Sequence, residues 1–294
     1  PEEVAQIEAA LGISHAMYEK ILHLLRPGMI EQELVGAAEG VVLAAGSHTS
    51  FPTILSIRGE TLHNHNHGNT VKPGDLLLVD SGAESPLGYA SDITRTFPVS
   101  GRFEPRQKEI YEIVLAAQTK AIGMIRPGLP FREAHLAAAQ VIAEGLTAIG
   151  LMRGDPPAAV AAGAHALFFP HGLGHALGLD VHDMEGLGET YVGYDDEFVR
   201  SDQFGLAYLR FARRLEAGHV MTVEPGIYFI PTLIAAWKKE ARHAAFIDYA
   251  AVDRYVGFGG IRIEDDVLVT PEGRRVLGPA IPKTVADVES ALAK

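Results

Sequence analysis

Three histidines lie close together near the middle of the chain. They occur in FPHGLGHALGLDVHD, residues 169–183, as His171, His175 and His182. The four-residue step from His171 to His175 is typical of two zinc ligands on one face of a helix. The glycines of this segment weaken a helix, and in an extended chain positions 171 and 175 also share a side. We therefore expect an extended segment, in which His182 would lie on the other side unless the chain bends near 178–180.

Four carboxylates lie at the ends of short apolar runs that are expected to be buried strands. They are Asp80, Asp92, Glu224 and Glu264. Burial of an acid is costly unless the acid is ion-paired or bound to a metal. For any one of the four, a salt bridge to Arg95 or Arg262 is an equal alternative. Four like charges at one centre would repel each other, so together they require cations.

Four carboxylates and one imidazole can hold two divalent ions about 3.5–4 Å apart, with a water or hydroxide between them. The chain has no cysteine, which excludes thiolate ligands and disulfides. A set of mostly oxygen ligands favours manganese, with cobalt, iron or zinc as substitutes, over a closed structural zinc site. A two-metal site lowers the pKa of its water and polarises a carbonyl group, which is the chemistry of amide hydrolysis.

Four helices are expected from apolar residues at steps of three and four. An Arg-Pro-Gly sequence, which terminates a helix, follows the first and the third of them at 26–28 and 126–128. The second and the fourth helix each begin shortly after one of these Arg-Pro-Gly sequences. The expected helices are residues 2–25, 31–45, 106–125 and 131–149.

The strands repeat as the helices do. VKPGDLLLVDSG (71–82) has the same layout as LEAGHVMTVEPG (215–226), which aligns Asp80 with Glu224. Asp92 and Glu264 then each precede a glycine by nine residues. Chance is an alternative for the helix stops, and two copies are too few for a solenoid.

The repeat predicts an α+β fold of two duplicated halves, about 1–100 and 101–284. Each half would contribute a helix pair and antiparallel strands. The helices would cover one side of a curved, mostly antiparallel sheet.

The composition is that of a folded protein, with 294 residues of which 47% are hydrophobic. A net charge of −12 disfavours binding to nucleic acid or to anionic membranes, because both need a basic face. The most apolar window, 156–170, is shorter than the ~20 residues that cross a bilayer. No signal peptide is evident. We therefore expect a cytoplasmic protein with no membrane or nucleic-acid partner.

Five segments resemble, in order, the sequence blocks of the pita-bread (M24) metallopeptidases: LLLVDSGAE, YASDITRTFPVSG, PHGLGHALGLDVHD, VEPGIYF and GIRIEDDVLV. They are most similar to the Xaa-Pro branch, which includes aminopeptidase P and prolidase. The resemblance covers about residues 1–284. It implies the pita-bread fold, a dinuclear metal centre and hydrolysis of the bond before a proline.

Carried over position by position, the resemblance implies five metal ligands. Glu224 would also move protons for the attacking water. The implied ligands are Asp80, Asp92, His175, Glu224 and Glu264.

The resemblance also implies residues on the substrate side. His182 matches the histidine at the scissile bond, His63 a further substrate-side histidine, and His171 one that helps form the pocket around the proline. Arg262 matches a basic residue close to the site. His63 belongs to LHNHNHG, whose alternating histidines could instead form a separate metal site or an exposed loop.

The resemblance leaves several alternatives open. The activity could be that of an aminopeptidase or of an Xaa-Pro dipeptidase (prolidase). Methionine aminopeptidase, a creatine-hydrolysing relative and a non-catalytic binding module are weaker alternatives, because the acids and His171 are all present.

We expect residues 1–294 to form one catalytic domain without the family's usual N-terminal domain, in a homodimer. The segment 186–215 could be a lid, a pocket wall or a dimer contact.

Overall fold

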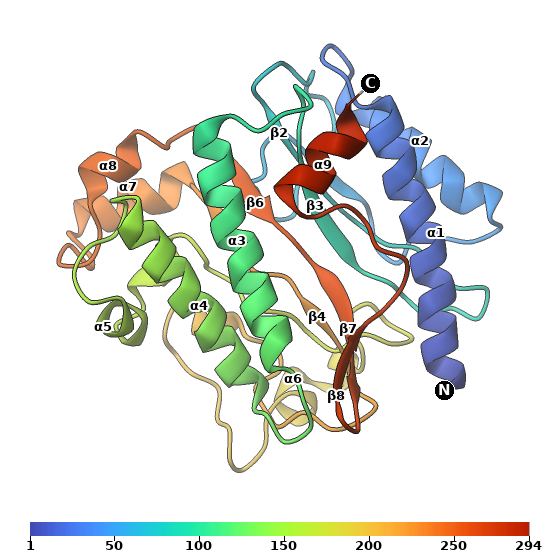
Figure 1. Cartoon of the computed structure of the whole chain (residues 1–294). Helices are drawn as coiled ribbons and strands as arrows, with labels where there is room; N and C mark the ends of the chain where they lie inside the picture. Colours follow the sequence, from blue (N-terminus) through green and yellow to red (C-terminus); the bar gives the residue numbers. More distant parts are fainter. Residues whose placement is uncertain (294) are drawn as a thin grey trace.

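Two similar halves meet along a set of antiparallel strands (Figure 1). The structure is a computed structural model that describes residues 1–293. The elements of the first half are α1 (Glu2–Leu24), α2 (Glu31–Ala44), β1 (Ile54–Ser56), β2 (Leu76–Ser81) and β3 (Ile93–Pro98). The main elements of the second half are α3 (Pro105–Met124), α4 (Phe131–Ala148), β4 (Val220–Val223), β5 (Gly226–Tyr228), β6 (Gly260–Arg262), β7 (Asp265–Thr270) and β8 (Gly273–Val276).

Shorter elements connect these or follow them. Between α4 and β4 lie α5 (Pro156–Ala161), η1 (Ala164–Leu167), η2 (Glu185–Leu187), α6 (Glu189–Val192) and η3 (Leu206–Tyr208). Between β5 and β6 lie α7 (Pro231–Lys239) and α8 (Tyr249–Asp253), and α9 (Val285–Leu292) follows β8.

The four long helices begin and end within one residue of the predicted bounds. After α1 and α3 the chain turns at Gly28 and Gly128, whose φ angles are +92° and +81°. Glycine adopts this left-handed conformation without the steric penalty that a Cβ brings. No helix within residues 1–293 is both long enough and apolar enough to cross a membrane.

The same hydrogen bonds tie helix to strand in both halves. In α1, the Tyr18 hydroxyl donates to the Val79 carbonyl at 3.1 Å, and in α3 the Gln118 amide donates to the Val223 carbonyl at 3.3 Å. Val79 and Val223 directly precede Asp80 and Glu224. The duplication predicted from the sequence is therefore visible in the contacts of the structure.

The strands form sheets of order β1-β2-β3, β4-β7-β8 and β5-β6, with every pair antiparallel. The halves join where Thr94 of β3 pairs with Glu264, just after β6, and the Glu264 amide donates to the Thr94 carbonyl at 3.0 Å. In Figure 1, α1 and α2 lie beside the strands of the first half and α3 and α4 beside those of the second. The acids at the strand ends are thus brought to the seam between the halves.

Arg95 of β3 is buried behind this seam, with 2% of its surface exposed. Its guanidinium donates to the carbonyl of Glu264 at 2.6 Å and to the carboxylate of Asp265 at 2.6 Å. Asp265 also pairs with Lys283. Arg95 is therefore not the partner of any of the four predicted site acids, because its carboxylate partner is Asp265.

Two histidines, His135 of α4 and His165 of η1, are fully buried with their ring centroids 6.5 Å apart. None of their nitrogens has a hydrogen-bond partner among the described residues. Burial lowers the pKa of His135 to about 3 and that of His165 to about 4. Both imidazoles are therefore neutral in the folded protein at neutral pH.

These buried histidines predict acid sensitivity. A histidine whose pKa falls on folding contributes stability that is complete above pH 6.5 and is lost as the pH falls toward 4. Each contributes a slope approaching ~1.4 kcal/mol per pH unit in that window. Urea unfolding of the wild type and of His165→Leu at pH 7, 6 and 5 should give a shallower slope for the variant. Equal slopes would contradict the prediction.

Arg95→Met should lower the free energy of unfolding by about 3–5 kcal/mol, because it leaves buried acceptors without their cation. The measurement is urea unfolding at pH 7. Arg102→Met is the matched control, since Arg102 is exposed, and it should change stability by less than ~0.5 kcal/mol. Similar losses in the two variants would show that the Arg95 contacts do not hold the halves together.

Candidate active site

A cavity of about 630 Å³ opens at the seam between the halves. It is lined by carboxylates from the strand ends, by the histidine-rich segment and by the loop after β1. All nine residues predicted from the sequence line it: His63, Asp80, Asp92, His171, His175, His182, Glu224, Arg262 and Glu264.

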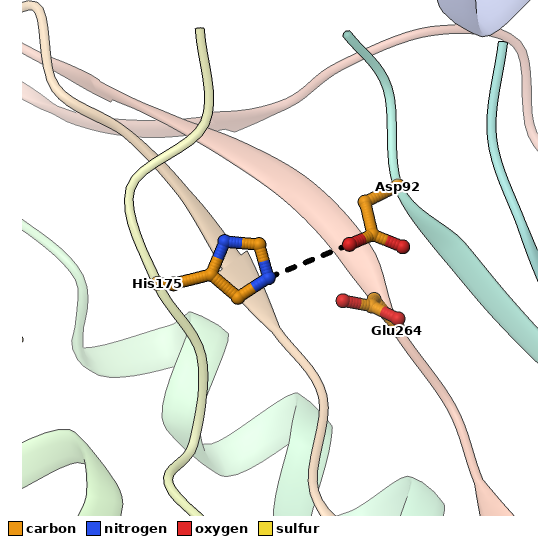
Figure 2. A group of neighbouring side chains, drawn as sticks. All are labelled: Asp92, His175 and Glu264. Carbon is orange, nitrogen blue, oxygen red and sulfur yellow. Dashed lines mark ion pairs between the residues drawn. The ribbon is translucent and has the colours of Figure 1, made fainter. Parts of the chain in front are cut away.

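Three of these residues form a compact group that could hold a metal ion. Asp92, His175 and Glu264 are buried, and one ligand atom from each lies within 4.8 Å of the others. His175 Nε2 is 3.4 Å from Asp92 Oδ2, with Glu264 beside them (Figure 2). Asp92 precedes β3, Glu264 lies between β6 and β7, and His175 comes from the glycine-rich segment. The group therefore draws on both halves of the chain.

Hydrogen bonds fix the orientation of His175. Its backbone amide donates to the Thr222 hydroxyl at 3.0 Å, and its Nδ1 is 3.0 Å from the Ala176 carbonyl. With Nδ1 as the donor, Nε2 keeps its lone pair for a ligand, as is usual for metal-binding histidines. Glu224 lies on the same side, with Oε1 3.6 Å from Nε2.

The segment that carries the histidines is not a helix, as predicted. A Cβ at Gly174 would lie 2.0 Å from the Thr222 carbonyl oxygen, so only glycine fits this close approach. The Asp183 amide donates to the Ala176 carbonyl at 3.0 Å, which turns the chain back on itself at the predicted bend. His182 consequently lies against His175, with ring centroids 4.4 Å apart.

The carboxylates fit a divalent cation. Asp80 Oδ1, Asp92 Oδ1 and Glu264 Oε1 are buried and have no hydrogen-bond partner among the described residues. Burial, together with the neighbouring carboxylates, raises the pKa of Asp92 and Glu264 well above the usual carboxyl value. Burial also raises the pKa of Glu224. Unpartnered acid oxygens crowded in a buried cluster are the donor set that hard divalent cations prefer.

Arg262 is a buried cation that contacts this cluster directly. Only 4% of its surface is exposed. Its guanidinium pairs with Asp80, donates to Tyr228 at 3.0 Å and donates to the Thr94 hydroxyl at 3.1 Å. Thr94 in turn donates to Glu264 at 2.6 Å. The salt-bridge alternative thus holds for Asp80 alone.

The three histidines that the family resemblance places on the substrate side are kept neutral. Burial lowers the pKa of His171 and of His182 to about 3, and lowers the pKa of His63 as well. The cation of Arg262 adds to the effect at His171 and His63, as does the ring of His175 at His182. Neutral imidazoles can donate or accept a hydrogen bond, but they do not neutralise the carboxylates.

The alternating histidines do not form a second metal site among the described residues. His63 and His65 both line the cavity, whereas the His67 ring bonds to the Leu55 carbonyl at 3.0 Å. Within residues 1–293, Asp92, His175 and Glu264 are the group whose ligand atoms lie within 4.8 Å of one another, and no histidine of this loop belongs to it.

Several residues of the site were not predicted. Tyr228 lies between His171 and Arg262 and bonds to both, at 2.9 and 3.0 Å. Its signal was present in VEPGIYF, where it ends a strand next to Glu224. Asp266 accepts a hydrogen bond from the Asp92 amide at 3.1 Å. Its only signal in the sequence is its place as the last of three consecutive acids in GIRIEDD.

The segment 186–215, left open by the sequence, forms part of the wall of the cavity. Five of its residues line it: Glu189, Arg200, Phe204, Tyr208 and Arg210. Arg200 pairs with Glu189, and Arg210 pairs with Glu185 and Glu189. This wall is therefore charged on one part and aromatic on another.

Known proteins are similar to this chain over nearly its whole length. The human Xaa-Pro dipeptidase is 38% identical over 290 residues, which are 96% of this chain and 57% of the human protein. A probable Xaa-Pro aminopeptidase of Fusarium vanettenii is 37% identical over 291 residues, covering 98% of this chain and 61% of that protein. The structure of Pseudomonas aeruginosa aminopeptidase PepP matches with a TM-score of 0.79 and 35% identity, over 99% of this chain and 58% of that one.

These likenesses confirm the pita-bread fold. The chain spans less than two thirds of the length of these relatives. The model of metallopeptidase family M24 matches residues 5–271, and this chain therefore belongs to that family.

Proposed function

We propose that this protein is a metal-dependent exopeptidase that hydrolyses the bond between an N-terminal residue and a following proline. The observation that carries the proposal is one cavity in which the acid cluster faces three neutral histidines. The Xaa-Pro relatives support the choice of substrate. An X-Pro bond lacks an N–H and restricts the preceding residue, so a dedicated pocket is reasonable.

We propose two divalent ions, held by the five predicted ligands, with manganese as the resident metal. The mostly oxygen donor set supports manganese over zinc. When bound, such ions would polarise the scissile carbonyl and make a water acidic enough to attack it. Arg262 pairs with Asp80 and so offsets part of the carboxylate charge, and the ions would offset the rest. The proposed ligands are Asp80, Asp92, His175, Glu224 and Glu264.

Glu224 is the proposed proton carrier. Its Oε1 accepts weakly from the Thr222 hydroxyl at 3.4 Å, so the carboxylate is held from the strand side and faces the cavity. It takes a proton from the attacking water as oxygen adds to the carbonyl carbon. It then gives that proton to the proline nitrogen as the C–N bond breaks.

His171 contributes its ring rather than a hydrogen bond. Its Nδ1 is 2.7 Å from the Gly172 carbonyl and its Nε2 is 2.9 Å from the Tyr228 hydroxyl, so both nitrogens are already engaged. The ring packs edge-to-face against Phe169, with the two ring centroids 4.9 Å apart. It therefore offers an apolar surface to the pyrrolidine ring. His182 and His63 remain as the hydrogen-bonding groups for the peptide.

The alternative, an Xaa-Pro dipeptidase, is favoured by the charged part of the cavity wall. Arg210 lines the cavity and 35% of its side chain is exposed. A dipeptide places its terminal carboxylate close to the scissile bond, and a guanidinium is the side chain best suited to bind it. Glu185 and Glu189 would have to share Arg210 with that carboxylate.

The remaining expectations are also proposals. We propose that residues 1–294 act as one catalytic domain, in a homodimeric cytoplasmic protein that binds neither nucleic acid nor membranes. The net charge of −12 supports the absence of acidic partners.

The test of the proposed function is product analysis with manganese present. Gly-Pro, Ala-Pro and a longer Ala-Pro peptide should release the N-terminal residue, whereas matched peptides with alanine in place of proline should be cleaved far more slowly. Cleavage of dipeptides alone would identify a prolidase. Cleavage of the alanine peptides alone would contradict the X-Pro assignment.

Glu224→Gln should lower kcat by at least ~10²-fold, because the amide cannot carry the proton. The measurement is turnover of the best X-Pro substrate at saturating manganese, with bound metal determined in parallel. Glu216→Gln is the matched control, since Glu216 is exposed and does not line the cavity, and it should retain full turnover. An active Glu224→Gln variant with unchanged metal content would exclude both roles proposed for Glu224.

A further inference from the structure

His63 lies on a long loop, residues 57–69, that has no helix or strand of its own. The loop leaves β1 at Ser56 and ends beside Thr70, which pairs with Ile30. A loop of this length needs anchors if one of its side chains is to keep a fixed place in the cavity.

One carboxylate, that of Glu31 at the start of α2, anchors both ends of this loop. Its Oε1 accepts from the Ile57 amide at 2.7 Å and from the Ser56 hydroxyl at 3.1 Å. Its Oε2 accepts from the side chain of Asn69 at 3.0 Å and from the Asn69 backbone amide at 3.4 Å. The two ends of the loop are thus held by two oxygens of one group.

A short chain of hydrogen bonds runs from Glu31 to the neighbour of His63. The Ser56 hydroxyl donates to Glu31 and accepts from the Asn64 amide at 3.0 Å. Asn64 directly follows His63. The hydroxyl uses its one proton toward the carboxylate, so the direction of this chain is fixed by Glu31.

Glu31 is fully buried, and no ion pair with it occurs among the described residues. Burial of a carboxylate without a cation is costly unless hydrogen bonds compensate. All four of its partners are donors, so only a carboxylate accepts from every one of them. A glutamine would direct its NH₂ group at one pair of donors.

The other half of the molecule shows that the fold does not require an acid here. Phe131 occupies the same position at the start of α4 and is also fully buried. Its amide donates to the Arg213 carbonyl at 3.0 Å, just as the Glu31 amide donates to the Asn69 carbonyl at 3.0 Å. The backbone arrangement is therefore satisfied by an apolar residue, and the carboxylate of Glu31 serves the loop that only the first half carries.

We propose that Glu31 is a positioning residue that sets the place of His63 in the cavity by anchoring both ends of the loop 57–69. The inference rests on the proposed function, because His63 is assigned there to the peptide substrate. Glu31 itself is not among the residues that line the cavity, so its effect passes through His63.

The first test is kinetic and uses the full chain with manganese. Glu31→Gln should lower kcat/KM by about tenfold, as expected for a displaced contact group, with bound metal unchanged. Combining it with His63→Ala should give no further loss beyond His63→Ala alone. Glu39→Gln, on the same helix and without a contact to the loop, should behave as the wild type. Additive losses in the double variant would overturn the proposal, because they would indicate a general structural effect.

The second test does not depend on activity. Hydrogen–deuterium exchange of the peptides covering 57–69 should become at least several-fold faster in Glu31→Gln, while exchange of α1 and β2 stays the same. Unchanged exchange in the loop would overturn the proposal even if the protein cleaves no X-Pro peptide. Failure of the wild type on every peptide, with faster loop exchange in the variant, would instead reject the proposed function and leave the anchoring role of Glu31 supported.

Discussion

The mutual repulsion of buried carboxylates at the seam between the halves is the constraint on which the rest of the site depends. Asp92 and Glu264 are both buried there, and burial together with neighbouring carboxylates raises the pKa of each. A cluster of this kind is stable only if positive charge enters it. The neutral histidines cannot supply that charge, and Arg262 supplies it mainly to Asp80. Divalent cations would meet the remaining demand, and with them hydrolytic chemistry would become possible at this seam.

The duplicated fold explains how the acids come together. Asp80 and Glu224 occupy equivalent strand ends in the two halves, as do Asp92 and Glu264, and antiparallel pairing of Thr94 with Glu264 joins the halves so that all four line one cavity. A symmetric frame alone would bind ions without distinguishing the two sides of a peptide. The histidine segment and the wall 186–215 belong only to the second half, and the loop that carries His63 belongs only to the first. These additions make the cavity directional.

The sequence predicted the long helices, the duplication and every one of the nine proposed site residues that line the cavity. The helices, the duplication and the four acids depend on local patterns, because Arg-Pro-Gly ends a helix and an acid follows an apolar strand. The roles of the histidines and of Arg262 were implied by the family resemblance. The partner of the buried Arg95 could not be predicted, since it is Asp265, 170 positions away in the chain. Tyr228 escaped prediction for the same reason, and the choice among a lid, a pocket wall and a dimer contact for 186–215 stayed open, because these roles depend on packing between distant segments.

Comparison of the two halves separates what the fold needs from what the site needs. Tyr18 and Gln118 differ in chemistry yet bond to equivalent carbonyls, so that position serves the frame common to both halves. At Glu31 and Phe131 the backbone amides make equivalent hydrogen bonds, but only the Glu31 side chain has polar partners. In a duplicated fold, the two halves can keep the same backbone contact while one has an apolar and the other a charged buried side chain. The charged side chain then interacts with a segment that is not part of the repeat. In this protein that segment is the loop 57–69, which Glu31 anchors and which brings His63 to the acids.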